Sequence, residues 1–160
     1  MPEADPQVSS DYLDTLLQYY EEEIEGEAYF YGLAEHFKER EKTLLLARVE
    51  RKAASMLEYL LVHYRLQPRD DATLARSGRE YVGTHREWEW GRFMSYIVER
   101  YPGYVDDFLG LEAMAPAADL PALKALTEHE EVVIDFARRE LAGDVDSCQP
   151  LLDYLAKGRP

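Results

Sequence analysis

The stretch YYEEEIEGEAYF, residues 19–30, decides how the chain is interpreted, because it interleaves five glutamates with four aromatic residues around one glycine. An α-helix turns about 100° per residue, so apolar residues three and four apart share one face. Such a stripe runs through and beyond the stretch: Leu13, Leu16, Leu17, Tyr20, Ile24, Tyr31 and Ala34. Glu27 falls inside this stripe and Glu23 lies near it, whereas Glu21 and Glu25 point largely away. The stretch predicts an amphipathic helix with one or two carboxylates turned toward a core.

The composition indicates one soluble globular domain, covering residues 1–160, with a flexible N-terminus at residues 1–8. The hydrophobic fraction of 46% is enough for a core, and the net charge of −14 argues against nucleic acid and anionic membranes as partners. The single cysteine, Cys148, excludes an internal disulfide and a cysteine metal cluster. The first residues lack the pattern of a signal peptide, and no apolar run reaches the roughly 20 residues of a membrane span. We therefore expect a cytoplasmic protein.

Helical periodicity and turn residues predict an all-α chain. The expected helices cover residues 9–38, 42–66, 73–100, 104–115, 120–142 and 150–156. Ser9, Ser10 and Asp11 offer N-cap oxygens for the first helix, and Gly143 suits a C-terminal cap. An interruption is expected near Gly83, and Pro102 with the following glycine breaks the third long segment. Four long antiparallel segments, the third of them kinked, and a short C-terminal helix indicate a four-helix bundle.

Each long segment offers an inward carboxylate. Glu50 borders the apolar stripe of the second segment, and Glu130 lies in the centre of the fourth. Antiparallel geometry places Glu99 opposite Glu130. The alternatives on the third segment are Asp106, Asp107 and Glu112. An ionised carboxylate in an apolar interior costs several kcal/mol unless it is paired or bound to a cation. The pairing alternatives are Lys52 or Arg48 for Glu27, and Arg86 or Arg92 for Glu130.

Three segments carry a resemblance to a known family: EIEGEAYFYGLAEHF (residues 23–37), LLLARVERKAASML (44–57) and LTEHEEVVIDFARREL (126–141). With them the chain resembles the ferritin-like superfamily, in particular its rubrerythrin-like and aldehyde-deformylating-oxygenase-like branches. The resemblance implies two irons, held by a glutamate on the first and third helices and a Glu-x-x-His motif on the second and fourth. Carried over, the glutamates are Glu27 (or Glu25, by the local Glu-x-x-Ala pattern), Glu50, Glu99 and Glu130.

This sequence departs from the family pattern because both motif histidines are missing. Ala53 stands three residues after Glu50, and Val133 three residues after Glu130. His129, beside Glu130 at the edge of its face, remains a candidate ligand. One hypothesis is a di-iron or other di-metal site, manganese included, for oxidoreductase chemistry with O₂, peroxide or a small molecule, or for metal handling. The alternative is a metal-free ferritin-like bundle that serves as a structural or protein-interaction module.

The aromatic residues lead to a further expectation. Tyr20, Tyr31, Tyr59 and Tyr64 have the spacing of core residues. Trp88 and Trp90 are two residues apart, so both cannot face inward from one regular helix. An exposed tryptophan is typical of a protein contact. We therefore predict a homodimer.

Overall fold

The computed structural model describes residues 8–160, and all the regular secondary structure within this range is helical. The long helices are α1 (Ser10–Ala34), α2 (Arg40–His63) and α7 (Leu120–Leu141), and a broken segment is formed by α5 (Trp90–Arg100) and α6 (Pro102–Met114). The shorter elements are α3 (Asp71–Glu80), α4 (Val82–His85), the 3₁₀ helix η1 (Ala117–Asp119) and α8 (Gln149–Leu155). The predicted all-α class is confirmed for this range. Among these residues, no helix has both the length and the apolar character that crossing a membrane requires.

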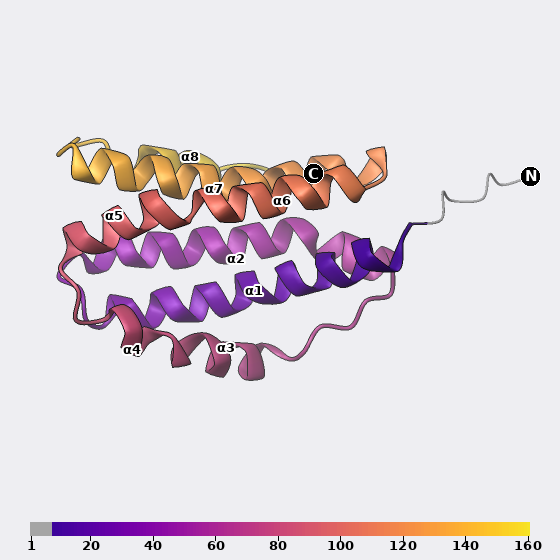
Figure 1. Ribbon diagram of the computed structural model, residues 1–160, viewed down its shortest axis with the longest axis horizontal. Coiled ribbons are helices and arrows are strands. Elements are labelled where there is room, and N and C mark those ends of the chain that lie inside the picture. Colours follow the sequence, from indigo (N-terminus) through magenta and orange to yellow (C-terminus); the bar gives the residue numbers. More distant parts are fainter. Residues whose placement is uncertain (1–7) are drawn as a thin grey trace, which may run out of the picture.

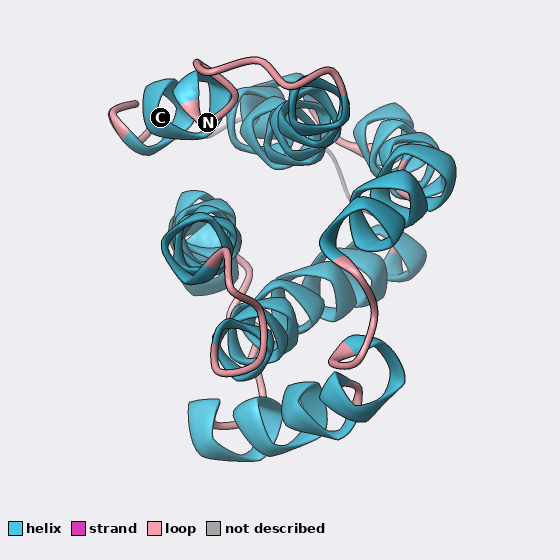
Figure 2. Ribbon diagram, turned by 90° about the vertical axis from the view of Figure 1, so that its left-hand side faces the viewer, coloured by secondary structure: helices cyan, strands magenta, loops and turns pink. Residues whose placement is uncertain are grey.

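The helices pack as two hairpins joined by a long return (Figure 1). The antiparallel pair α1 and α2 forms the first hairpin, and α5–α6 with α7 forms the second. Between them, α3 and α4 run back along the outside of α1, so that α2 and α5–α6 point in the same direction (Figure 1). The end view in Figure 2 shows these helices with their connecting loops. Finally, α8 packs against α2 and α7.

The helix boundaries follow local chemistry. The Ser9 side chain accepts a hydrogen bond of 3.1 Å from the backbone N–H of Tyr12, as the N-cap prediction requires. Gly143 has a φ of 71°, the left-handed conformation that ends α7. Pro102 opens α6 and separates it from α5, which confirms the predicted break. By contrast, α2 ends three residues earlier than predicted, because Arg65 adopts a left-handed φ of 55° just beyond it.

The described chain starts inside the segment that was predicted to be flexible. Residues 1–7 lie outside the described range, so the prediction for them is not addressed. Val8, however, is half-buried and packs against the core cluster that contains Tyr12 and Leu16. Val8 therefore belongs to the packed part of the chain, which corrects the prediction for this one residue.

The apolar stripe of α1 is shifted relative to the prediction. Phe30 and Leu33 are buried in the cluster that contains Phe93 of α5. Tyr31 lies about 100° around the helix from Phe30 and is 44% exposed, so its predicted core position is wrong. Tyr59 and Leu141 are exposed as well.

The two tryptophans both pack against the core. The connection between α4 and α5 is not a regular helix, so Trp88 and Trp90 can each turn toward the same hydrophobic cluster. The Trp90 indole N–H donates a hydrogen bond of 2.8 Å to Glu140, and the Arg92 guanidinium stacks 3.8 Å from the Trp88 ring centre. The expectation of an exposed tryptophan is wrong, and the homodimer stays a prediction without that support.

A buried aspartate ties the ends of three helices together. The Asp119 Oδ2 atom accepts hydrogen bonds of 2.6 Å from the hydroxyls of Tyr12 and Tyr64. Replacing Asp119 with Ala leaves both hydroxyls without this acceptor, so we expect a loss of about 2–3 kcal/mol in the free energy of unfolding. Urea denaturation followed by circular dichroism measures it. The matched change at exposed Asp106 is expected to stay within about 0.5 kcal/mol of wild type; equal losses would contradict the role of Asp119.

Candidate metal centre

Four ionisable side chains meet in the interior. They form the Glu/His cluster, in which α1 supplies Glu23, α2 supplies Glu50, and α7 supplies His129 and Glu130; all four are buried. The Nε2 atom of His129 lies 2.9 Å from Glu23 Oε2, 3.4 Å from Glu50 Oε2 and 3.2 Å from Glu130 Oε2. Three carboxylates therefore converge on one imidazole nitrogen.

The contacts around His129 Nε2 lack hydrogen-bond alignment. The other ring nitrogen, Nδ1, contacts the backbone carbonyl of Leu126 one turn earlier, which favours a proton on Nδ1. In the neutral ring Nε2 then carries a lone pair, which faces oxygens that also carry lone pairs. Among the described residues, neither His129 Nε2 nor Glu23 Oε2 has a hydrogen-bond partner, and Glu130 Oε1 has none either. The cluster therefore needs a proton, on His129 or on a carboxylate, or a bound cation.

The electrostatics of the cluster favour retained protons when no cation is present. Burial, reinforced by the neighbouring Glu23 carboxylate, raises the pKa of Glu50 well above its ordinary value. Burial also raises the pKa of Glu130, although His129 opposes the shift. Burial by itself would lower the pKa of His129, but the carboxylates of Glu23 and Glu130 outweigh it and raise that pKa well above its ordinary value. All three shifts therefore favour binding of protons to the folded protein.

One glycine and two aromatic rings shape the space around the cluster. A Cβ atom at Gly26 would lie 3.1 Å from Glu50 Oε2, so glycine leaves room for this carboxylate. The rings of Phe108 and Tyr154 lie 5.6 and 6.4 Å from the His129 ring, centre to centre. The Tyr154 hydroxyl donates a hydrogen bond of 2.9 Å to the Ala125 carbonyl, which fixes α8 over α7. The imidazole is thereby excluded from water.

Two of the glutamates predicted from sequence lie in the cluster and two do not. Glu50 and Glu130 are buried as predicted. Glu27 is not part of the cluster: both its oxygens accept hydrogen bonds of 2.8 Å from Arg51. Glu23 takes its place. Glu23 and Glu27 are one helical turn apart on nearly the same face, so the preference of the periodicity for Glu27 was slight. The neighbouring side chains decide instead: Arg51 of α2 pairs with Glu27, and His129 of α7 faces Glu23.

The third long segment contributes no carboxylate to the cluster. Glu99 is exposed at the end of α5, which corrects its predicted inward position, and Asp106 and Asp107 are exposed too. Glu112 accepts a hydrogen bond of 2.6 Å from Thr127. Glu25, the alternative on α1, accepts one of 2.8 Å from Ser77. The break at Pro102 resets the helical phase, and the segment presents buried Tyr101 and Phe108 to the interior instead.

His129 lies deeper than its sequence position indicated. It is fully buried rather than at the edge of its face, because α7 is covered by α2, α5, α6 and α8 at once. On such a helix the buried arc is wide, and it includes Thr127, His129 and Glu130. Glu23 had a weaker signal in the sequence: it continues the series Leu16, Tyr20 at three- and four-residue spacing.

A cavity of about 520 Å³ opens beside the cluster. Its wall includes the carboxyl-bearing residues Glu23, Glu50 and Glu130. Five tyrosines line the rest of it: Tyr29, Tyr81, Tyr96, Tyr101 and Tyr104. The Tyr29 hydroxyl hydrogen-bonds to His85 Nδ1 at 2.6 Å, and burial, together with the charge of Arg92, lowers the pKa of His85. The lowered pKa favours a neutral His85 ring beside Tyr29. We call this space the tyrosine cavity.

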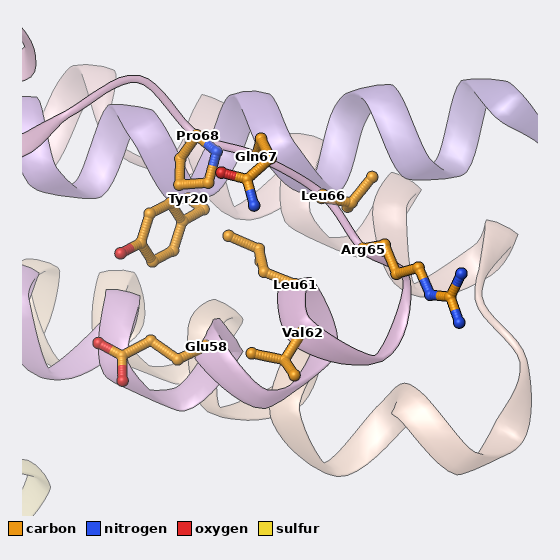
Figure 3. A pocket seen from close by; sticks show the side chains of 8 residues that line it. All are labelled: Tyr20, Glu58, Leu61, Val62, Arg65, Leu66, Gln67 and Pro68. Atoms are coloured by element: carbon orange, nitrogen blue, oxygen red, sulfur yellow. The ribbon is translucent and has the colours of Figure 1, made fainter.

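A second pocket, of about 530 Å³, lies at the C-terminal end of α2 (Figure 3). Figure 3 shows that its side chains come from the end of α2, the segment that follows it and Tyr20 of α1. Glu58 and Arg65 are its charged lining residues, and both are near solvent. None of the unpartnered buried polar atoms found in residues 8–160 belongs to its lining. The Glu/His cluster is therefore the stronger candidate site.

Comparison with known proteins does not assign the chain to a family: no family model matches it, and neither a curated protein nor a solved structure gives a significant match. We therefore infer the function from the geometry of the cluster and the cavity.

Proposed function

We propose that this protein is a metal-binding helical bundle of ferritin-like architecture. Two antiparallel helix pairs joined by one long crossover are the arrangement of ferritin-like bundles. In this chain α3 and α4 provide the crossover, and α2 and α5–α6 consequently run in the same direction. In ferritin-like bundles, metal ligands project inward from facing helices, as Glu23, Glu50 and Glu130 do here.

The proposed ligands are Glu23, Glu50 and His129, with Glu130 beside them. One ligand atom from each of the first three lies within 4.8 Å of the others. The strongest support for this metal site is that His129 Nε2 faces three carboxylate oxygens at 2.9–3.4 Å without hydrogen-bond alignment. Buried charges that lack partners cost several kcal/mol, and a divalent cation would remove that cost for the whole cluster.

The donor set is compatible with iron and manganese, the two metals proposed here. Imidazole suits iron and carboxylates suit manganese, whereas a site without cysteine is less suited to the softer metals. A single ion is proposed rather than the di-iron site of the family pattern, because α5–α6 presents Tyr101 and Phe108 where a further carboxylate would be needed. The identity of the bound metal and the number of ions per chain can both be measured.

The proposed activity is oxidoreductase chemistry on a small molecule. A bound iron or manganese ion supplies one-electron and O₂ or peroxide chemistry. The chain itself supplies the neutralising carboxylates, a water-excluded imidazole and a tyrosine-lined cavity that reaches Glu23, Glu50 and Glu130. The tyrosine hydroxyls can orient a polar substrate group, and the rings can pack against its apolar part.

Metal titration tests the proposal. Protein treated with a chelator is titrated with Fe²⁺ or Mn²⁺ under anaerobic conditions, and bound metal is measured by elemental analysis after desalting. About one metal ion per chain is expected to be retained by the proposed cluster. If neither metal is retained and neither changes the melting temperature, the metal-free bundle is the correct interpretation, with a protonated His129 balancing the carboxylates.

The pH dependence of this binding follows from the raised pKa values of Glu50, Glu130 and His129. In the metal-free protein each such group adds stability that is fully present below its unfolded-state pKa and is lost as the pH rises through its folded-state pKa. Metal binding needs the deprotonated groups, so affinity rises with pH. We expect the melting-temperature increase caused by saturating Mn²⁺ to be larger at about pH 8 than at about pH 5.5. An increase that is larger at the lower pH would contradict the ligand assignment.

A further inference from the structure

The tyrosine cavity combines aromatic faces with carboxylates. Besides its five tyrosines, the lining includes Phe30, Phe108 and His85. Glu22 and Glu25 also belong to the lining. Glu22 accepts a hydrogen bond from Gln18, and Glu25 lies 3.6 Å from the guanidinium of Arg69. Among the described lining residues there is no lysine and no arginine. The lining thus offers electron-rich rings and carboxyl groups, and a bound cation can take the place of the protons that the cluster otherwise retains.

Two carboxylate oxygens in the buried part of the lining lack a hydrogen-bond donor. Glu23 Oε2 and Glu130 Oε1 have no hydrogen-bond partner among residues 8–160, and both side chains are almost fully buried. Aromatic faces attract cations, most strongly where water is excluded. Carboxylates attract the same ligands and repel anions, and the effect is larger in a poorly solvated site than in water.

We propose that the tyrosine cavity binds a small organic cation, a protonated amine with an apolar or aromatic body. A volume of about 520 Å³ is sufficient for a small molecule. The mouth is lined by Tyr81 and Tyr104, which are 60% and 45% exposed, so the ligand enters from solvent. Its ammonium group lies toward the carboxylates, and its body packs against the tyrosine rings. The proposal depends on the lining and does not require that a metal is bound.

Three probes of one size and different charge test the proposal: benzylamine, benzyl alcohol and benzoate. Binding is measured by isothermal titration calorimetry at neutral pH, first with chelator-treated protein and then with protein incubated with Mn²⁺. Benzylamine is expected to bind at least about tenfold more tightly than benzyl alcohol, and benzoate more weakly than either. With Mn²⁺ bound, the preference for benzylamine is expected to become smaller but not to reverse, because the metal engages the carboxylates of the cluster while the tyrosine rings stay in the lining.

A pair of variants with unchanged net charge separates the cavity from general attraction to an acidic protein. Tyr104→Leu removes a ring from the cavity, whereas Tyr31→Leu removes a ring of nearly equal exposure, 44% against 45%, from outside the lining. Benzylamine affinity is expected to fall at least about fivefold in the first variant and to stay unchanged in the second. Tyr81→Leu serves the same purpose if Tyr104→Leu does not fold.

The outcomes distinguish this proposal from the metal site. Equal affinity for benzylamine and benzyl alcohol, tighter binding of benzoate, or equal effects of Tyr104→Leu and Tyr31→Leu would overturn it. Amine binding in a protein that retains no metal would leave it standing while the proposed metal site fails. If the protein retains metal but does not prefer benzylamine, the metal site stands and the proposal for the tyrosine cavity fails.

Discussion

The variant Glu50→Gln is expected to lose the stabilisation that Mn²⁺ or Fe²⁺ gives to the wild-type protein. A ligand at 100 times its dissociation constant stabilises by about 2.7 kcal/mol, which corresponds to a rise of roughly 5–10 °C in melting temperature for a chain of this size. The Glu50 carboxylate belongs to the group whose ligand atoms lie within 4.8 Å of one another. An amide keeps the shape of the side chain and removes its charge, so the rise is expected to disappear.

The matched control is Glu27→Gln. Glu27 is the glutamate that the sequence pattern favoured, and it pairs with Arg51 outside the cluster. This variant is expected to keep the metal-dependent rise in melting temperature, whatever its effect on baseline stability. Loss of the rise in Glu27→Gln, together with its retention in Glu50→Gln, would contradict the assignment of the metal to the Glu/His cluster. Without metal, Glu50→Gln is expected to melt above wild type at neutral pH, because a buried carboxylate with a raised pKa is removed.

The second large effect is expected from Gly78→Ala in α3. A Cβ atom at Gly78 would lie 2.1 Å from the backbone carbonyl oxygen of Glu25 in α1, and backbone atoms cannot yield as a flexible side chain can. The two helices must separate, so we expect a loss of about 3 kcal/mol or more in the free energy of unfolding. Both Gly78 and Glu25 line the tyrosine cavity, and amine binding should weaken as well.

The control for this variant is Gly110→Ala in α6. No atom of residues 8–160 lies within 4 Å of a Cβ atom built at Gly110, and the residue is exposed in a helix interior. Alanine there is expected to stabilise by about 0.5–1 kcal/mol, because glycine loses more conformational freedom on folding. Denaturation curves for the two variants should therefore move in opposite directions from wild type. Equal small shifts would show that α3 does not approach α1 as closely as described.

Local signals predicted the helices well because local chemistry sets their ends. The cap at Ser9, the break at Pro102 and the left-handed Gly143 each depend on a few neighbouring residues. Two helix ends were missed: α1 ends at Ala34 rather than at residue 38, and α2 ends at His63 rather than at residue 66. The end of α2 depends on a left-handed arginine, Arg65, which carries no such signal. Tyr31 was misplaced for a different reason. Whether a tyrosine on the edge of a stripe is buried depends on which neighbouring helix covers it.

The candidate site was predictable in part. Glu50 and Glu130 were found because each lies on or beside a clear apolar stripe. The choice of Glu23 over Glu27 needed the positions of Arg51 and His129, which come from other helices. Glu99 was wrong because the break at Pro102 removes the phase relation between α5 and α6. Tertiary contacts rather than periodicity decide these positions.

The most direct test of the central claim is anomalous X-ray diffraction at the iron or manganese absorption edge from crystals of the metal-loaded protein. The account predicts one anomalous peak within coordination distance of Glu23, Glu50 and His129 Nε2. A peak elsewhere, or none beside His129 at full metal loading, would contradict it.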